Sequence, residues 1–152
     1  MSQKIITVGK KHEDWVVSGI ERYQKRLRGG FLVEWVLLPH SSLEGVTARQ
    51  EESERILSRL KQDDFVVLLD ERGKNFSSPA LSELLTLHIA QGKQLVFVIG
   101  GAYGVDERVH ERAQVVWSLS PLVFPHQLVR LILIEQLYRA QQIAAGSAYH
   151  HD

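Results

Sequence analysis

The residues from 95 to 145 decide the fold of this chain: residues 95–105 read LVFVIGGAYGV, and residues 115–145 read VVWSLSPLVFPHQLVRLILIEQLYRAQQIAA. In the first segment a short apolar strand runs into a Gly-Gly turn. In the second, another strand leads into an apolar loop with two prolines, and a long helix follows. Loops usually face water, so a loop this apolar is expected to pack against something. Two strand ends shaped by glycine or proline therefore predict a ligand site built largely from backbone.

The composition is that of an ordinary globular protein, with 152 residues, 44% hydrophobic and 24% charged. This length predicts a single domain over residues 1–152. The chain has no cysteine, which excludes disulfides, thiolate metal sites and cysteine nucleophiles. It shows neither the apolar core of a signal peptide nor a run of about 20 apolar residues that would span a bilayer, so we expect a cytoplasmic protein.

Charge is balanced over the whole chain but not along it. There are 18 Lys and Arg against 18 Asp and Glu, yet residues 1–30 carry a local excess of +4. A solvated helix face is one explanation of the basic residues near the end of this segment. The other is a local contact with a polyanion such as RNA, made by Arg22, Lys25, Arg26 and Arg28.

Short apolar runs alternate with segments of helical periodicity. The runs predict strands at residues 4–8, 31–38, 65–69, 95–99 and 115–119. The helical patterns cover residues 14–27, 47–60, 79–90, 106–112 and 127–145. This alternation predicts an α/β fold with a parallel-rich sheet and helices on both faces.

Three of the predicted strand ends are unusual, and ligands of open parallel sheets bind beyond the carboxyl ends of strands. Residues 70–74 read DERGK, residues 100–104 read GGAYG and residues 120–126 read SPLVFPH. A turn would explain any one of these segments, but three together favour a ligand site.

Neither a G-x-G-x-x-G fingerprint nor a phosphate-binding P-loop is present. An adenosine-like ligand without phosphates, such as S-adenosylmethionine, suits a pocket of apolar side chains and backbone groups.

No metal site and no catalytic triad are expected. The adjacent His150, His151 and Asp152 at the chain end seldom converge on one ion. The sequence contains neither H-E-x-x-H nor G-x-S-x-G. With an already electrophilic methyl donor, catalysis would depend mostly on positioning, which can supply up to about 7–11 kcal/mol.

The long helix at residues 127–145 is apolar around nearly its whole circumference, which predicts burial on more than one side. One side would face the sheet and the other a second copy of the chain, giving a homodimer; complete burial within the monomer is the alternative. Leu133→Glu or Leu137→Glu is expected to disrupt the dimer if the residue faces away from the sheet. Glu135 and Arg139 have the spacing of a helical ion pair, and a buried Arg130 beside a site would suit a phosphate.

Five motifs resemble the RlmH family of ribosomal RNA methyltransferases, which belongs to the SPOUT (α/β-knot) superfamily. They are ITVGK at residues 6–10, LLDERGK at 68–74, FVIGGAYG at 97–104, WSLSPLVFPHQLVRLILIEQLYRA at 117–140 and AYHHD at 148–152. The resemblance implies methylation of N3 of a pseudouridine in 23S rRNA on the assembled ribosome, with S-adenosylmethionine as cofactor. It also implies a homodimer and a C-terminal trefoil knot, a threading that chain-folding rules do not predict.

The resemblance also implies the site residues. Cofactor contacts fall on Leu69, Gly101, Ser120, Pro121, Leu122, Val123, Phe124 and Pro125. Candidate catalytic residues on the acceptor side are His126, Arg130, Arg139, Tyr149 and His150. A side chain added at Gly101 is expected to project toward the cofactor, so Gly101→Val would abolish its binding. Tyr149 is expected to stack on the target base and His150 to accept or relay the N3 proton or to hold the uracil edge.

Two other functions stay open on the sequence alone. One is a related knotted methyltransferase with a tRNA substrate. The other is a non-catalytic nucleotide-binding or RNA-binding module with a flavodoxin-like strand order. Transfer of labelled methyl groups separates catalysis from binding, and a comparison of ribosomes, naked rRNA and tRNA separates the substrates.

Overall fold

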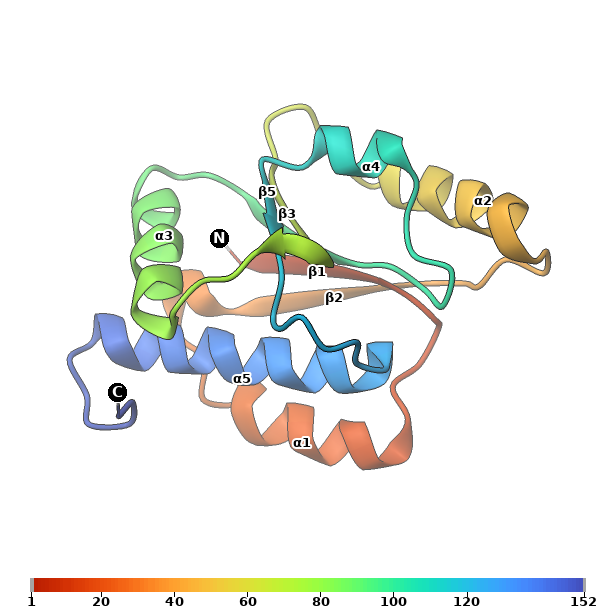
Figure 1. Cartoon of the computed structure of the whole chain (residues 1–152). Helices are drawn as coiled ribbons and strands as arrows, with labels where there is room; N and C mark the ends of the chain where they lie inside the picture. Colours follow the sequence, from red (N-terminus) through yellow and green to blue (C-terminus); the bar gives the residue numbers. More distant parts are fainter. Residues whose placement is uncertain (1, 152) are drawn as a thin grey trace.

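Within residues 2–151, which the computed structural model describes, five strands alternate with five α-helices and one 3-10 helix (Figure 1). Met1 and Asp152 lie outside the described residues, so the ends of the predicted 1–152 domain and the last residue of the AYHHD motif are not placed. The strands are β1 (Gln3–Val8), β2 (Val33–Leu38), β3 (Phe65–Lys74), β4 (Leu95–Ile99) and β5 (Val115–Trp117). The helices are α1 (Asp14–Gln24), η1 (Gly29–Phe31), α2 (Gly45–Leu57), α3 (Ser78–Ala90), α4 (Glu107–Arg112) and α5 (His126–Ala144).

The strands form one sheet in the order β2-β1-β4-β3-β5, and every pair in it is parallel. The predicted α/β fold with a parallel sheet is therefore confirmed. Because all strands run the same way, their carboxyl ends meet at one edge. β3 and β4 are neighbours, and β5 lies beside β3, so the three strand ends singled out in the sequence are adjacent in space.

Both faces of the sheet are buried, as side-chain alternation along the strands requires. In β4, Phe97 and Ile99 belong to one apolar cluster and Val96 and Val98 to the other. The first cluster also contains residues of α1, α3 and α5. The second contains residues of α2 and α4. Helices thus cover both faces: Figure 1 shows α5 running below the strands between α1 and α3, with α2 and α4 above them.

Helix α5 buries one stripe of side chains against the sheet and the two neighbouring helices. Leu133 and Leu137 belong to this stripe and are fully buried. The proposed test of dimerisation by Leu133→Glu or Leu137→Glu is therefore wrong, because either charge would enter the core of one chain. The opposite side of the helix carries Leu128 and Ile132, which are half-buried. These two are the outward-facing apolar residues, since they lie one turn apart and opposite the buried stripe.

The third strand is longer than predicted. β3 continues through DERGK at residues 70–74, which we expected to form a loop after the strand. Leu69 pairs with Trp117, and after an irregularity Lys74 lies opposite the same tryptophan. The chain between them bulges beside the strand ends. The other predicted elements agree with the structure to within three residues at each end.

Among the described residues, no helix combines the length and apolar character needed to cross a membrane. The long helix α5 shows why. It carries Arg130, Glu135 and Arg139 among its apolar residues, and its buried stripe packs on the sheet rather than facing outward.

Candidate functional site

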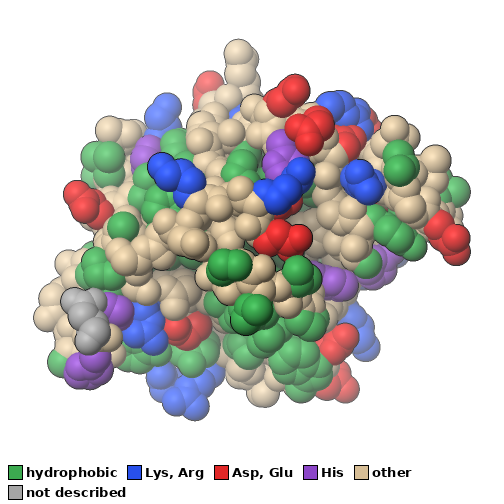
Figure 2. All heavy atoms as spheres, viewed as in Figure 1, with side chains coloured by type: hydrophobic (Ala, Val, Ile, Leu, Met, Phe, Trp, Pro, Cys, Tyr) green, Lys and Arg blue, Asp and Glu red, His purple; other side chains and the backbone are tan. Residues whose placement is uncertain are grey.

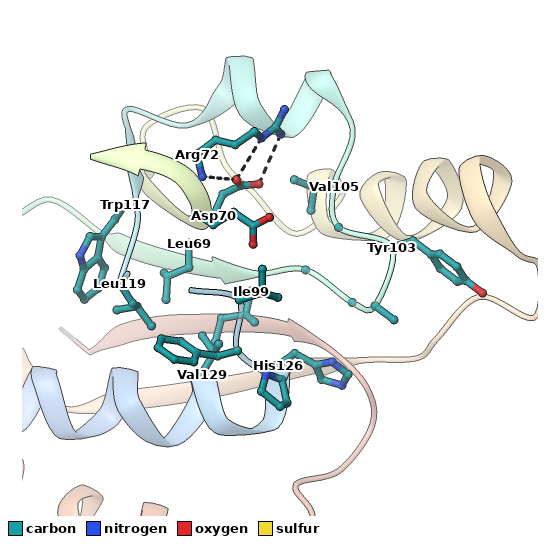
Figure 3. Close-up of a pocket in the computed structure, with 18 of the residues that line it drawn as sticks. Leu69, Asp70, Arg72, Ile99, Tyr103, Val105, Trp117, Leu119, His126 and Val129 are labelled. Atoms are coloured by element: carbon teal, nitrogen blue, oxygen red, sulfur yellow. Dashed lines mark hydrogen bonds and ion pairs between the residues drawn. The ribbon is translucent and has the colours of Figure 1, made fainter. Parts of the chain in front are cut away.

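A cavity of about 840 Å³ lies at the carboxyl ends of β3, β4 and β5 (Figure 3). The structure brings seven of the eight predicted cofactor residues together there. They are Leu69, Gly101, Ser120, Leu122, Val123, Phe124 and Pro125. Pro121 does not line the cavity. The end of β3 and the segments that follow β4 and β5, far apart in the sequence, therefore form one wall, as the strand order requires.

The cavity combines apolar side chains with exposed backbone. Leu69, Ile99 and Leu119 face it from three strands or strand ends, and Val129 faces it from α5 (Figure 3). This arrangement fits a flat heterocycle held between apolar groups and read by backbone N–H and C=O groups. Leu122 and Val123, at 69% and 75% exposed, form the outer rim.

Sequence reasoning missed several lining residues. Val129 lies one helical turn after His126, so the helical period was an available signal. Arg49 reaches the cavity from α2, where its Nε donates to the Tyr103 carbonyl oxygen at 3.0 Å. No local pattern marks this contact. Tyr103 lies at the far end of the cavity with its ring directed away from the other lining residues (Figure 3).

The Gly100–Gly104 turn is shaped by its glycines. Gly104 has a φ of +74°, a conformation that side-chain-bearing residues rarely adopt, and its N–H donates to the Gly101 carbonyl oxygen at 3.0 Å. At Gly101, an added Cβ would lie 2.8 Å from Glu52 Oε1 and 3.1 Å from Val8 Cγ1. A side chain there would enter the protein rather than the cavity. The expected projection toward the cofactor is wrong, and Gly101→Val would act by displacing the turn.

One wall of the cavity is polar. Burial tends to raise the pKa of Asp70, but hydrogen bonds from the Arg72 backbone and side chain and the charges of Arg72 and His110 outweigh it, so the pKa lies below its ordinary value. The Arg72 N–H donates to Asp70 Oδ1 at 2.9 Å, and His110 Nε2 lies 3.3 Å from Oδ2. Asp70 is therefore a carboxylate at neutral pH. Its charge is paired with Arg72, whose Nε lies 3.2 Å from Oδ1 and which lines the same wall.

His126 is the first residue of α5 and lines the same cavity. Burial lowers its pKa, and the charges of Arg130 and His40 lower it further. The His40 ring lies edge-on to it, with ring centroids 6.5 Å apart. His126 is accordingly neutral at pH 7 and has a nitrogen lone pair that can accept a proton.

The lowered pKa of His126 predicts a loss of stability in mild acid. As the pH falls below about 6.5, the unfolded chain takes up a proton at this histidine before the folded chain does, so the free energy of unfolding decreases. His12, whose pKa burial and Arg130 also lower, adds to the effect. In urea denaturation between about pH 7.5 and pH 5.5, His126→Gln is expected to lose less stability than wild type. Equal losses for the two proteins would contradict this.

Arg130 is fully buried rather than facing a substrate. Its Nη2 donates to the carbonyl oxygens of Val8 at 3.0 Å and Gly9 at 3.4 Å. Its Nη1 donates to the Lys11 carbonyl oxygen at 3.1 Å and to His12 Nδ1 at 3.2 Å. The expectation that Arg130 meets a phosphate is therefore corrected. With its donors turned to backbone carbonyls, the guanidinium holds the loop between β1 and α1.

The remaining candidate catalytic residues form a second group, at the other end of α5. Arg139 Nη1 donates to His150 Nδ1 at 3.1 Å, and its guanidinium lies 4.9 Å from the centre of the Tyr149 ring. Tyr149 also packs edge-on against Tyr138, with ring centroids 4.9 Å apart. Burial, together with the charge of Glu135, raises the pKa of the Tyr149 phenol. The tail is thus packed against α5 in an ordered position.

The basic segment after α1 lies beside this second group. Gln141 Oε1 accepts the Arg28 N–H at 2.6 Å, and Gln141 Nε2 donates to the Arg26 carbonyl oxygen at 3.0 Å. The side chains of the four predicted RNA-binding residues are exposed; these residues are Arg22, Lys25, Arg26 and Arg28. Arg139 lies thirteen positions after His126 on α5, so roughly 20 Å lies between the cavity and this group within one chain.

This fold and this strand-end cavity agree with what comparisons with known proteins show. The chain belongs to the SPOUT methyltransferase family: a sequence model described as "Predicted SPOUT methyltransferase" matches residues 1–150. The methyl donor of this family is S-adenosylmethionine, and membership implies the knotted C-terminal region expected from the sequence.

Curated relatives match over almost their full length. A protein of Christiangramia forsetii is 41% identical, with 99% of each chain covered. One of Geotalea daltonii is 42% identical over 99% of this chain and 100% of the relative. One of Streptococcus mutans is 39% identical, again with 99% of each chain covered. All three are named "Ribosomal RNA large subunit methyltransferase H".

Proposed function

We propose that this protein transfers a methyl group from S-adenosylmethionine to N3 of a pseudouridine in 23S rRNA, and that its substrate is the assembled ribosome. The observation that carries the proposal is the single cavity formed by the three predicted strand-end loops, in a chain of the SPOUT methyltransferase family. The relatives' names support a ribosomal RNA substrate. Such a substrate places the protein in the cytoplasm.

The lining residues fit the cofactor. The apolar walls at Leu69, Ile99 and Leu119 suit an adenine ring, while the Gly100–Gly104 turn offers backbone groups. When bound, the cofactor supplies a methyl group that is already electrophilic, so no covalent intermediate with the protein is required.

The chain must also orient the acceptor and receive its proton. Neutral His126 at the cavity wall is placed to accept a proton from N3 as the methyl group arrives. Tyr149 offers an aromatic ring, and His150, whose Nδ1 accepts from Arg139, offers an Nε2–H that can hold the edge of the base, but both lie at the far end of α5 from this cavity. A site that combines His126 at the cavity with Tyr149 and His150 therefore requires a second chain.

We therefore propose a homodimer in which the tail and basic segment of one subunit meet the cavity of the other. The outward side of α5 has apolar Leu128 and Ile132 toward its cavity end and the Glu135–Arg139 pair, at 3.1 Å, further along. Figure 2 shows the same division. Hydrophobic side chains gather over α1 and the first half of α5, and charged side chains lie over the last turns of α5. An antiparallel pairing of two such helices would place each tail beside the partner's cavity.

Ile132→Glu is expected to convert the dimer into a folded monomer, because it puts a charge on the outward side of α5 without touching the core. Analytical ultracentrifugation at micromolar concentration measures this, with circular dichroism as the check on folding. Gln50→Glu, at an exposed position on α2 across the sheet from α5, is the matched control and should stay dimeric. A wild-type protein that sediments as a monomer under these conditions would rule out the dimer.

The reaction itself is tested by identifying the modified nucleoside. Ribosomes that lack the modification are incubated with the protein and S-adenosylmethionine, and the 23S rRNA is digested and examined by mass spectrometry. The proposal predicts a pseudouridine that carries one added methyl group on N3. Methylation of a ribose or of another base would contradict it.

A further inference from the structure

Glu52 is a buried acid on α2, a helix whose other acidic residues are largely accessible. Its side chain is 3% exposed. Oε2 accepts the Ser41 N–H at 2.9 Å, whereas Oε1 is buried without a hydrogen-bond partner among the described residues. A buried carboxylate oxygen without a partner costs free energy. Such a group at this position therefore calls for a reason other than stability.

The unpartnered oxygen lies directly behind the turn that lines the cavity. A Cβ built on Gly101 would come within 2.8 Å of Glu52 Oε1, closer than real Cβ contacts occur. Gly101 lines the cavity, whereas Glu52 does not. The carboxylate thus fills the space that a side chain at position 101 would need, on the side of the turn that faces away from the cavity.

The other carboxylate oxygen fixes a second loop of the site. Ser41, whose N–H it accepts, directly follows His40, and the His40 ring packs edge-on against His126. One buried side chain therefore contacts both the loop that carries His40 and the turn that carries Gly101. These two loops follow different strands, β2 and β4, and no backbone pairing joins them.

From this geometry we infer that Glu52 is a positioning residue for the cofactor: its carboxylate sets where the Gly100–Gly104 turn lies and imposes glycine at position 101. The inference rests on the proposed cofactor cavity. Glu52 does not line the cavity, so it acts only through the turn and through the His40 loop.

A double-mutant cycle tests this by calorimetric titration with S-adenosylmethionine. Glu52→Ala leaves a void behind the turn and is expected to weaken binding about tenfold, or about 1.4 kcal/mol. Glu52→Gln keeps the length and volume and should bind within about twofold of wild type. Gly101→Ala alone should weaken binding more than Glu52→Ala does. The protein with both Glu52→Ala and Gly101→Ala should bind S-adenosylmethionine more tightly than the protein with Gly101→Ala alone, because the void left by Glu52 accepts the new methyl group.

Glu51→Ala is the matched control, since Glu51 is on the same helix and pairs with Arg55 at 2.8 Å away from the cavity. It should bind the cofactor as wild type does. Steady-state kinetics add a second readout: Glu52→Ala should raise the KM for the cofactor and change kcat at saturation little. Wild-type affinity in Glu52→Ala, or independent effects of the two substitutions in the cycle, would overturn the inference.

Thermal denaturation without cofactor keeps this test separate from the proposed function. The conflict between Glu52 and a side chain at position 101 does not depend on the cofactor, so the two substitutions should also be non-additive in their effects on Tm. If wild type binds no S-adenosylmethionine, the proposed function fails. If the effects of the two substitutions on Tm are then additive, the steric role of Glu52 is overturned as well. If the effects are non-additive, the steric role stands even though the proposed function has failed.

Discussion

Removal of residues 149–152 is expected to reduce methyl transfer to ribosomes by about 10²–10⁴-fold, the range that a positioned acid or base contributes. Tyr149 and His150 are held against α5 by Tyr138 and Arg139, so the tail is ordered rather than frayed. It lies at the opposite end of α5 from the cavity of its own chain. Dimerisation and cofactor affinity should therefore remain unchanged in the truncated protein, while kcat falls.

Mixed dimers make the result specific to a site shared between subunits. Truncated chains combined with chains that carry Gly101→Val should regain activity, because one of the two composite sites is then intact. His151→Ala is the control for an exposed tail residue and should behave as wild type. A truncated enzyme with unchanged kcat and KM would show that the tail has no part in the reaction.

Arg130→Ala is expected to lower the free energy of unfolding by about 1–3 kcal/mol for each buried carbonyl oxygen that it leaves without a donor. The substitution leaves the Val8 and Lys11 carbonyl oxygens without their donors in a site closed to water. The loop between β1 and α1 then loses its contact with α5. Urea denaturation of the purified protein measures the change.

The matched control is Arg55→Ala, which removes a partly exposed arginine that pairs with Glu51 at 2.8 Å and donates to the Pro39 carbonyl oxygen at 2.9 Å. Pairs of that kind contribute about 0.2–1 kcal/mol. The loss of free energy of unfolding in Arg130→Lys should fall between the losses in Arg130→Ala and Arg55→Ala, because lysine offers fewer donors in a less fixed geometry. An Arg130→Ala protein as stable as Arg55→Ala would show that the buried hydrogen bonds contribute little.

Most of the fold could be predicted from local sequence patterns. The period-2 and period-3.6 patterns predicted each strand and α-helix, and the strand-end rule predicted a site beyond the carboxyl ends of residues 65–69, 95–99 and 115–119, where the cavity lies. The individual cofactor contacts came from the family resemblance. The motif at residues 70–74 was assigned to a loop because its charged residues and glycine are typical of a turn. It continues β3 instead, since a bulge returns Lys74 to pairing with Trp117.

Side-chain environments were less predictable. Arg130 and Arg139 look alike on the long helix, yet one faces the core and the other the outer side, because only the packing of α5 on the sheet sets the helix rotation. The contact of Glu52 with Gly101 joins residues almost fifty positions apart, and no local pattern encodes it. The C-terminal knot came from family resemblance alone, since neither periodicity nor composition specifies how a chain threads.

The most direct test of the central claim is transfer of labelled methyl groups from S-adenosylmethionine to three substrates in parallel: intact ribosomes, naked 23S rRNA and tRNA. Because the chain as a whole is neutral and only a local basic segment is available, isolated RNA should be a poor substrate. We expect label in the 23S rRNA of intact ribosomes, little in naked rRNA and none in tRNA. Label in tRNA alone would identify a different substrate, and the absence of label from all three would contradict the assignment of a ribosomal RNA methyltransferase.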